Sequence, residues 1–563
     1  MSKPYFQHLP EHIIDQIVGY ALQMYYGYTS LHGHVALTIL HSSHRWRHTL
    51  IKKTCDELQI NYGPKSKCRH NITNWPQALD DPCFPFYHFV KHFRISTEWQ
   101  HVVDGSTLKF LRDEIPSDFR FDFAQSLELY IQGSPTLINI PISQMSEAFN
   151  NIAEFIKVAK CMVPNIRDIR IDWTYPSFLD SNGNYALSFK DLVADMLHGI
   201  PAVRFIEKTK LSLSTMLEPS SFQNLSSLTY VYCVAHTWFA NAIRKRSRTL
   251  IELRLLMVPK MVMNNLIFDD NGNPIVYRSL KLLDISHDDT SDYRYLDSKV
   301  THFPAIKRFV LFGEYPFATS QPFSSPISSL ESLNISLFSF KTDCDKKIKA
   351  LLSGKLENLK TVCFFNTVNN PNRNLVERYR DDGAQIYPIK AILKNTNSIR
   401  NFKLVGTSFD KDVVLNMITT HTAFKHMHSI HVGYCNLEFP SIVQILALVP
   451  NLRYFCCGLA SEFPQMDGCQ QNELIQLIDA ELSPMNKNIV TLDINNADSM
   501  PVEFIVETVA MLVIGCPRLS QLVIELYDMY SFIDMMDDFA RELPFPDHTS
   551  RLLNFTNNIY PQE

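Results

Sequence analysis

The sequence predicts an α/β fold in which a curved parallel sheet carries helices on its outer side and follows a short N-terminal helical segment. Three observations predict it: an apolar pattern that recurs along most of the chain, prolines that precede it, and amphipathic stretches that fill the intervals. Together they describe a solenoid, in which each repeat buries its apolar face against its neighbours. The 563 residues are 45% hydrophobic and 20% charged, which can support a large core.

The recurring unit is an apolar residue, two variable residues, a second apolar residue, one variable residue and a third apolar residue. One occurrence is weak evidence, because about one random triplet in eleven would match at this apolar content. Recurrence at intervals of roughly 20 to 40 residues, close to known repeat lengths, is stronger evidence. The first apolar positions are Ile166, Leu228, Leu250, Leu280, Ile306, Leu330, Leu359, Ile399, Met427, Leu452, Ile489 and Leu519. A degenerate unit is predicted at Val203 and Ile206, with Lys208 in the third position.

The intervals between the units are predicted to hold helices that end at prolines. Apolar residues recur at helical spacing within 146–163, 439–449 and 502–514. A proline ends a helix and biases the chain toward extended structure, which suits a junction between a helix and a strand. Such prolines stand two residues before an apolar triplet at Pro164, Pro201, Pro304, Pro450 and Pro517.

The segment 427–437 carries the fullest version of the pattern. After the apolar triplet that begins at Met427, Cys435 and Leu437 occupy the two further positions of a full repeat. This segment resembles a leucine-rich repeat, and the resemblance in irregular form covers roughly residues 120–530. A doubly wound α/β domain is the alternative, but it would need glycine-rich turns between strands and helices. The chain has 17 glycines and no glycine motif for nucleotide binding.

The first 55 residues have a different pattern. Leu9-Pro10 opens a helix with an apolar stripe, and a second apolar stretch ends in Arg45-Trp46-Arg47. This segment resembles the F-box, over roughly residues 8–50. The resemblance implies docking on a Skp-family adaptor, which links such proteins to a cullin ubiquitin ligase, through Leu9, Pro10, Ile13, Ile14, Ile17, Val18, Leu40 and Trp46. The alternative is that these helices only cap the first repeat.

Three regions follow from these patterns. Residues 1–55 are predicted as the F-box-like helical segment, 56–120 as a connecting or capping region, and 121–563 as an irregular leucine-rich-repeat solenoid with a C-terminal cap. Side chains alternate along a strand, so the variable residues of each unit are predicted to point to the concave face. The candidates for partner binding there are Asp168, Arg170, Asp172, Arg254, Asp284, Asn334, Lys403, His431, Asp493 and Asn495.

These candidates mix both signs of charge, which favours a protein ligand over a phosphate backbone. The formal net charge of −5 also gives no global basic field, so no nucleic-acid partner is expected. No apolar run is long enough to span a bilayer, and no signal peptide precedes the helices, so no membrane partner is expected. The 12 cysteines are scattered without a disulfide framework, which indicates a cytoplasmic or nuclear protein.

The sequence predicts no catalytic residue, no metal site and no cofactor. The histidines between His32 and His48 lack cysteine or acidic companions at zinc-binding spacing, and the cysteines between Cys55 and Cys83 lack a Cys-x-x-Cys pair. In the adjacent pair Cys456-Cys457, Cys457 occupies an apolar position of a repeat, which indicates a small buried residue and not a redox pair. No nucleophile elbow or metallohydrolase motif occurs.

The expected function follows from the two resemblances. The chain is expected to be the substrate-recognition subunit of a Skp–cullin–F-box type ubiquitin ligase, holding an unknown target protein on its repeat surface. It would be no enzyme itself, and it would act by raising the concentration of the target near the conjugating enzyme. The alternative is a repeat scaffold for protein interactions without a ligase role.

Overall fold

The structure is a computed structural model in which the chain forms two compact units. Unit 1 comprises Met1–Ile275 with Gln562–Glu563, and unit 2 comprises Val276–Pro561. The structure describes residues 57–61, 90–114, 120–132, 145–173, 200–207, 225–231, 243–258, 265–269, 271–287, 301–312, 329–337, 344–352, 356–365, 382–405, 411–460, 485–495, 500–524, 526, 529–543 and 546–559. The F-box-like segment, with Leu9, Pro10, Ile13, Ile14, Ile17, Val18, Leu40 and Trp46, lies outside the described residues.

Unit 1 contains a parallel sheet whose strands follow one another in sequence order. Its strands are β1 (Glu57–Asn61), β2 (His92–Glu98), β3 (Ser126–Gln132), β4 (Asp168–Trp173), β5 (Ala202–Glu207), β6 (Ser227–Val231) and β7 (Glu252–Val258). Its described helices are α5 (Trp99–Val103), α6 (Ser106–Glu114) and α7 (Met145–Met162). Each neighbouring pair from β1 to β7 is parallel. Each connection must therefore carry the chain back to the end of the sheet at which the previous strand began.

Unit 2 repeats this arrangement with more of its helices described. Its strands are β8 (Leu282–His287), β9 (Arg308–Phe312), β10 (Ser332–Ser336), β11 (Thr361–Phe365), β12 (Asn401–Val405), β13 (Ser429–Leu437), β14 (Tyr454–Leu459), β15 (Thr491–Asn495) and β16 (Gln521–Ile524). Its helices are α11 (Cys344–Leu352), α12 (Asp382–Lys394), α13 (Lys411–Thr420), the 3-10 helix η9 (Thr422–His426), α14 (Phe439–Leu448), α16 (Val502–Gly515), α17 (Met529–Glu542) and α18 (Pro546–Ile559).

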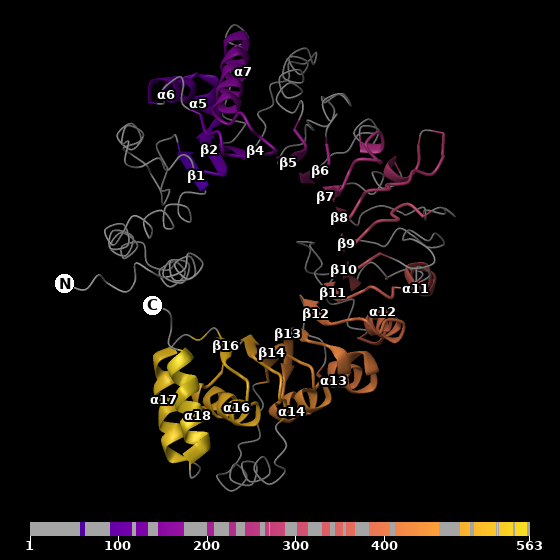
Figure 1. Cartoon of the computed structure of the whole chain (residues 1–563), viewed down its shortest axis with the longest axis vertical. Helices are drawn as coiled ribbons and strands as arrows, with labels where there is room; N and C mark the ends of the chain where they lie inside the picture. Colours follow the sequence, from indigo (N-terminus) through magenta and orange to yellow (C-terminus); the bar gives the residue numbers. More distant parts are fainter. Residues whose placement is uncertain are drawn as a thin grey trace, which may run out of the picture. The chain divides into compact units, whose positions relative to one another are not determined.

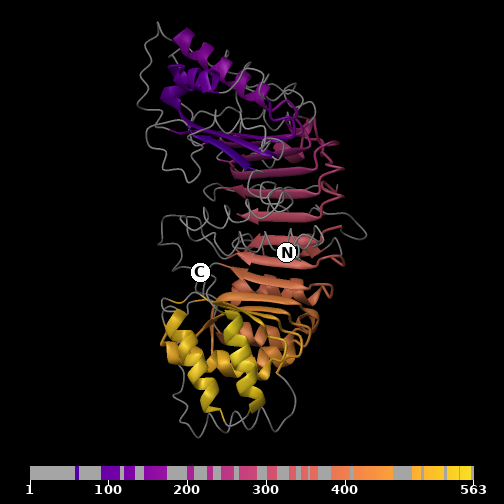
Figure 2. The ribbon, with the colours of Figure 1, turned by 60° about the vertical axis from the view of Figure 1, so that its left-hand side comes forward.

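The described helices of unit 2 from α11 to α16 lie on one side of its strands (Figure 1). The strands lie side by side in chain order, and α17 and α18 pack together at the C-terminal end of the unit (Figure 2). The predicted parallel α/β architecture is therefore confirmed, and so are three of the predicted helices. The stretches 146–163, 439–449 and 502–514 correspond to α7, α14 and α16, and each helix ends two residues before a predicted proline.

The apolar triplets form the core of both units. At β13 the triplet Met427, Ile430 and Val432, which begins two residues before the strand, is fully buried, with 0% exposure for each residue. The triplets that begin at Leu250, Leu280, Ile306, Leu330, Leu359, Ile399, Leu452 and Ile489 are buried in the same way. Because side chains alternate along a strand, these residues make one apolar face, and the residues between them make a second face, the polar face.

The strand register corrects two predicted units. Val203 in β5 pairs with Ile169 in β4 and with Leu228 in β6, so Val203 and Leu228 are second apolar positions. The corrected triplets begin at Ile200 and Leu225, which are both buried. Phe205 takes the third register position of the β5 unit, which is therefore intact. The sequence pattern assigns these two triplets to the wrong residues, because both strands are surrounded by further apolar residues that also fit the spacing of the pattern.

The repeating strands also begin earlier than the sequence predicts. The stretch 56–120, predicted as a connecting or capping region, contributes β1, β2, α5 and α6 to unit 1. Val90, Phe93 and Ile95 form a buried triplet there, and the rings of Phe93 and Phe121 stack at 4.6 Å. Ala124, Leu127 and Leu129 form the next triplet, in which alanine occupies the first position. Among the described helices, none combines the length and the apolar character needed to cross a bilayer.

Candidate binding face

The strand pairing of unit 1 aligns one residue from each unit in a row, and most members of this row are charged. These residues lie between the second and third apolar residues of each unit, and the strand pairing aligns them across the sheet. The row runs Gln59, Arg94, Glu128, Arg170, Arg204, Thr229 and Arg254. Neighbouring members are about 4.8 Å apart, the distance between adjacent strands.

Acidic residues lie beside two arginines of this row, Arg94 and Arg170. Arg94 Nε lies 3.6 Å from Glu128 Oε1, and its guanidinium lies 4.7 Å from the ring centre of Tyr130. Arg170 Nε donates a hydrogen bond of 3.1 Å to Asp168 Oδ2, which stands two residues earlier in the same strand. Arg170 and Asp168 remain 42% and 33% exposed, so both charges are accessible to a partner. The polar face around Arg94 and Arg170 therefore carries charges of both signs in fixed positions.

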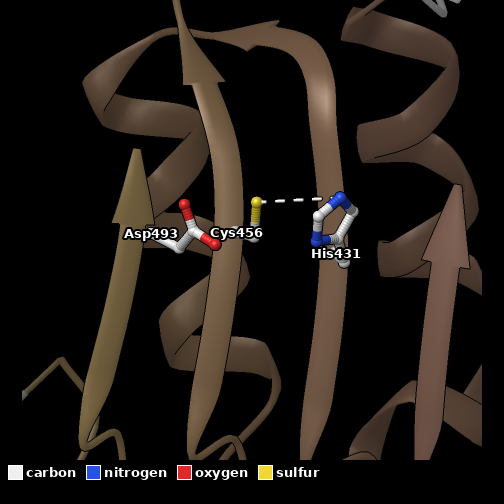
Figure 3. Close-up of side chains that lie close together, drawn as sticks. All are labelled: His431, Cys456 and Asp493. Atoms are coloured by element: carbon white, nitrogen blue, oxygen red, sulfur yellow. Dashed lines mark hydrogen bonds between the residues drawn. The ribbon is translucent and has the colours of Figure 1, made fainter. Parts of the chain in front are cut away.

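The equivalent row of unit 2 is less charged and contains a compact cluster. It runs Asp284, Val310, Asn334, Cys363, Lys403, His431, Cys456, Asp493 and Val523. His431, Cys456 and Asp493 lie on the adjacent strands β13, β14 and β15, with Cys456 in the middle (Figure 3). Cys456 Sγ lies 3.9 Å from His431 Nε2, and one ligand atom from each residue lies within 4.8 Å of the other two.

Two neighbouring side chains fix the surroundings of this cluster. The hydroxyl of Tyr454 donates a hydrogen bond to Oδ2 of Asp493 across the β14–β15 pair. The amide of Asn495 lies against Gly433, where a Cβ atom would come within 2.1 Å of Asn495 Nδ2 and 3.1 Å of Cys456 Sγ. Glycine is therefore required at position 433 if Asn495 is to occupy this place beside the thiol.

The protonation states follow from burial and neighbouring charges. Burial lowers the pKa of His431, with a smaller contribution from the positive charge of Lys403, so the imidazole is neutral near pH 7. Burial raises the pKa of the Cys456 thiol to about 12, and the carboxylate of Asp493 adds to the effect. Burial and the hydrogen bond to Asp493 also raise the pKa of Tyr454, so its hydroxyl stays protonated. The cluster thus holds a neutral thiol, a neutral imidazole and a carboxylate.

The structure brings some of the predicted partner-binding residues together and separates others. Asp168 and Arg170 touch each other, and His431 and Asp493 flank Cys456. Arg254, Asp284, Asn334 and Lys403 occupy the same row position on other strands. Asn495 lies two residues after Asp493 in β15, and Asp172 lies in β4 at the register position of Tyr130.

The sequence prediction of the binding face omits Cys456, Arg94 and Glu128. Cys457 is fully buried on the apolar face, as predicted, but Cys456 points to the opposite face, where it meets His431. The repeat itself holds the signal, because His431, Cys456 and Asp493 all stand between the second and third apolar residues of their units. Arg94 and Glu128 are omitted because they belong to units that precede the first predicted triplet.

Comparison with known proteins gives no family for the chain. No protein-family model matches it, and no curated protein matches it. The chain is similar to the crystal structure of a protein from Bacteroides fragilis, at 10% sequence identity and a TM-score of 0.27. The match covers 53% of this chain and 82% of that one. A TM-score of 0.27 is too low to indicate a shared fold or a shared function.

Proposed function

We propose that the chain is a binding protein that holds a protein partner on the polar face of its sheet. The observation that carries this proposal is the row of charged residues on that face of unit 1. Arg94, Arg170 and Arg254 share this row with the acid Glu128, and Asp168 and Glu252 stand two residues before Arg170 and Arg254 on the same face. A fixed pattern of both signs selects a partner by complementary charge placement, whereas a polyanion would favour one sign throughout.

The wider role proposed for this binding is substrate recognition in a Skp–cullin–F-box type ubiquitin ligase. Its support is the F-box-like pattern of residues 8–50, from Leu9-Pro10 to Trp46, in front of a repeat surface. In this role the N-terminal helices bind the adaptor and the polar face binds the target. The competing proposal, a scaffold without a ligase role, keeps the polar face as binding site but makes the N-terminal helices a cap.

Two sets of variants test the two halves of the proposal separately. The full chain and its variants are purified from cells, and the co-purified proteins are quantified by mass spectrometry. Leu9→Ala/Pro10→Ala/Ile13→Ala is expected to lose a Skp-family adaptor and to keep the target. Arg170→Glu/Arg254→Glu is expected to keep the adaptor and to lose the target, with binding that weakens as salt screens the charges.

A matched control separates the effect of where the charges lie from the effect of the net charge. Lys109→Glu/Lys157→Glu changes the net charge by the same amount, but both residues are exposed on the helices α6 and α7. This variant is expected to keep both partners. Wild-type protein that captures no Skp-family adaptor would leave only the scaffold function. Equal loss of the target in both charge variants would disprove recognition by the polar face.

A further inference from the structure

The cluster on β13, β14 and β15 has the chemical composition of a metal site. Thiolate, imidazole and carboxylate are the three side-chain types that bind zinc in proteins. Their ligand atoms come from consecutive strands at one register position, so the rigid sheet fixes their spacing. At Zn–S and Zn–N bond lengths of about 2.3 and 2.1 Å, tetrahedral geometry places sulfur and nitrogen roughly 3.6 Å apart. The 3.9 Å between Cys456 Sγ and His431 Nε2 is close to that value.

The rest of the row distinguishes this cluster from an ordinary polar surface. On β13, β14 and β15 three neighbouring row positions hold residues that can bind a metal. The row positions on β9, β10 and β16 instead hold Val310, Asn334 and Val523. Cys456 is fully buried, although it belongs to the polar face. Figure 3 shows the imidazole nitrogen directed at the sulfur, with the carboxylate of Asp493 on the other side.

Surrounding groups orient these side chains as the outer shell of a metal site would. Tyr454 binds one carboxylate oxygen of Asp493, which leaves the other oxygen available to a cation. The amide of Asn495 and the sulfur of Cys456 both border the space that Gly433 leaves open, 2.1 and 3.1 Å from where a Cβ atom would lie. Lys403, on the next strand, faces His431 but is exposed, so its ammonium group can turn to solvent.

We propose that His431, Cys456 and Asp493 form a zinc site, with Nε2, Sγ and one carboxylate oxygen as protein ligands and water in the fourth position. Zinc is favoured over magnesium or calcium, because those ions take oxygen ligands and the cluster offers sulfur and nitrogen. On binding, the thiol loses its proton to solvent and the thiolate coordinates the cation, with no change of oxidation state. The imidazole binds in its neutral form.

The first test uses the untagged full chain, freed of metal by a chelator and then titrated with Co²⁺ as a spectroscopic stand-in for Zn²⁺. A thiolate-to-cobalt charge-transfer band and tetrahedral visible bands are expected, and Zn²⁺ should displace them at one equivalent. This measurement needs no variant, so a folding defect cannot obscure it. Absence of a thiolate band in the wild-type protein would falsify the proposal.

Variants then assign the band to these residues. Cys456→Ala is expected to abolish it, and Asp493→Asn, which keeps the shape of the side chain, is expected to weaken Zn²⁺ binding by about tenfold or more. Cys363→Ala is the matched control, because Cys363 occupies the same row position on β11 beside Asn334 and Lys403. It should bind Zn²⁺ as the wild-type protein does. Equal Zn²⁺ uptake by wild type and Cys456→Ala would show that other groups hold the ion.

The pH dependence gives an independent readout. The groups that face the site are Lys403 on β12, His431 on β13, Tyr454 on β14 and Asp493 on β15. Between roughly pH 6.5 and 8.5 only the thiol must lose a proton to bind, so Zn²⁺ affinity should rise about tenfold per pH unit. An affinity independent of pH over this range would exclude Cys456 as a ligand.

Discussion

The side-chain amide of Asn486 donates a hydrogen bond of 2.9 Å to the backbone carbonyl oxygen of Leu446, 40 residues earlier in the chain. It donates a second bond of 2.8 Å to the carbonyl oxygen of Val449. Its Oδ1 accepts from the backbone N–H groups of Asn488 and Ile489. One buried side chain therefore satisfies the C-terminal carbonyls of α14 and the N–H groups that precede β15, and so joins two successive repeats.

Replacing Asn486 with alanine should destabilise unit 2 more than a typical surface change. The substitution leaves buried carbonyl and N–H groups without partners, so we expect the free energy of unfolding to fall by about 2–3 kcal/mol. Chemical denaturation monitored by circular dichroism measures the change. Asn488→Ala is the control, because the Asn488 side chain donates to Pro450 O at 2.9 Å on the exposed surface and should cost less than about 1 kcal/mol. Equal losses for the two variants would contradict the bridging role of Asn486.

Gly433→Ala should be destabilising because of one neighbouring side chain. The new Cβ would come within 2.1 Å of Asn495 Nδ2, so Asn495 must move, at a cost of about 1–2 kcal/mol. In an Asn495→Ala background this clash disappears, and the same substitution should cost clearly less. A double-mutant cycle measured by thermal unfolding tests this coupling. Additive effects would mean that Asn495 does not occupy the place beside Gly433.

Sequence reasoning predicts the strands well because their apolar triplets are read directly from the chain. It fails where the pattern is ambiguous, as at Val203, where several apolar residues allow more than one frame. It also fails where a small residue replaces a large one, as at Ala124. Pairing between strands resolves both cases, because the burial of a residue depends on its register with neighbours distant in sequence.

The cluster of His431, Cys456 and Asp493 is predictable from the sequence only in part. The alternation of side chains along a strand places His431 and Asp493 on the same face. The alternation alone does not mark Cys456 as a functional residue. Its neighbour Cys457 fits the apolar triplet, and a buried cysteine commonly acts as a small apolar residue. Nothing in the spacing of these residues resembles a metal motif, since the ligands come from three separate repeats.

The described cysteines should differ sharply in reactivity toward an alkylating reagent. Cys161 is exposed, whereas Cys456 is buried and the pKa of its thiol is raised to about 12. At pH 8 only about one Cys456 thiol in ten thousand is ionised, and the thiolate is the reactive form. Labelling of the native chain with iodoacetamide, followed by mass spectrometry, should therefore modify Cys161 at least roughly 100-fold faster. In denaturant the two rates should converge, and a persistent difference would point to local sequence instead of burial.

Arg551 should hold the C-terminal helix pair to the last repeats of unit 2. From α18, its guanidinium donates hydrogen bonds to the carbonyl oxygens of Ile514, at 3.2 Å, and of Cys516, at the end of α16. Arg551→Ala removes both donors from half-buried carbonyls, so unit 2 should lose about 1–3 kcal/mol of stability. Arg551→Lys should recover only part of this loss, because one ammonium group cannot reproduce the planar fork of donors.

Arg541 in α17 provides the matched control for Arg551. It is 66% exposed and pairs with Asp538, at 3.2 Å within the same helix, so Arg541→Ala should change stability by less than about 0.5 kcal/mol. Hydrogen exchange separates local from global effects, since Arg551→Ala should raise exchange in α17 and α18 before it does so in β13 or β14. Uniform acceleration across unit 2 would show that Arg551 supports the whole unit and not the attachment of its last two helices.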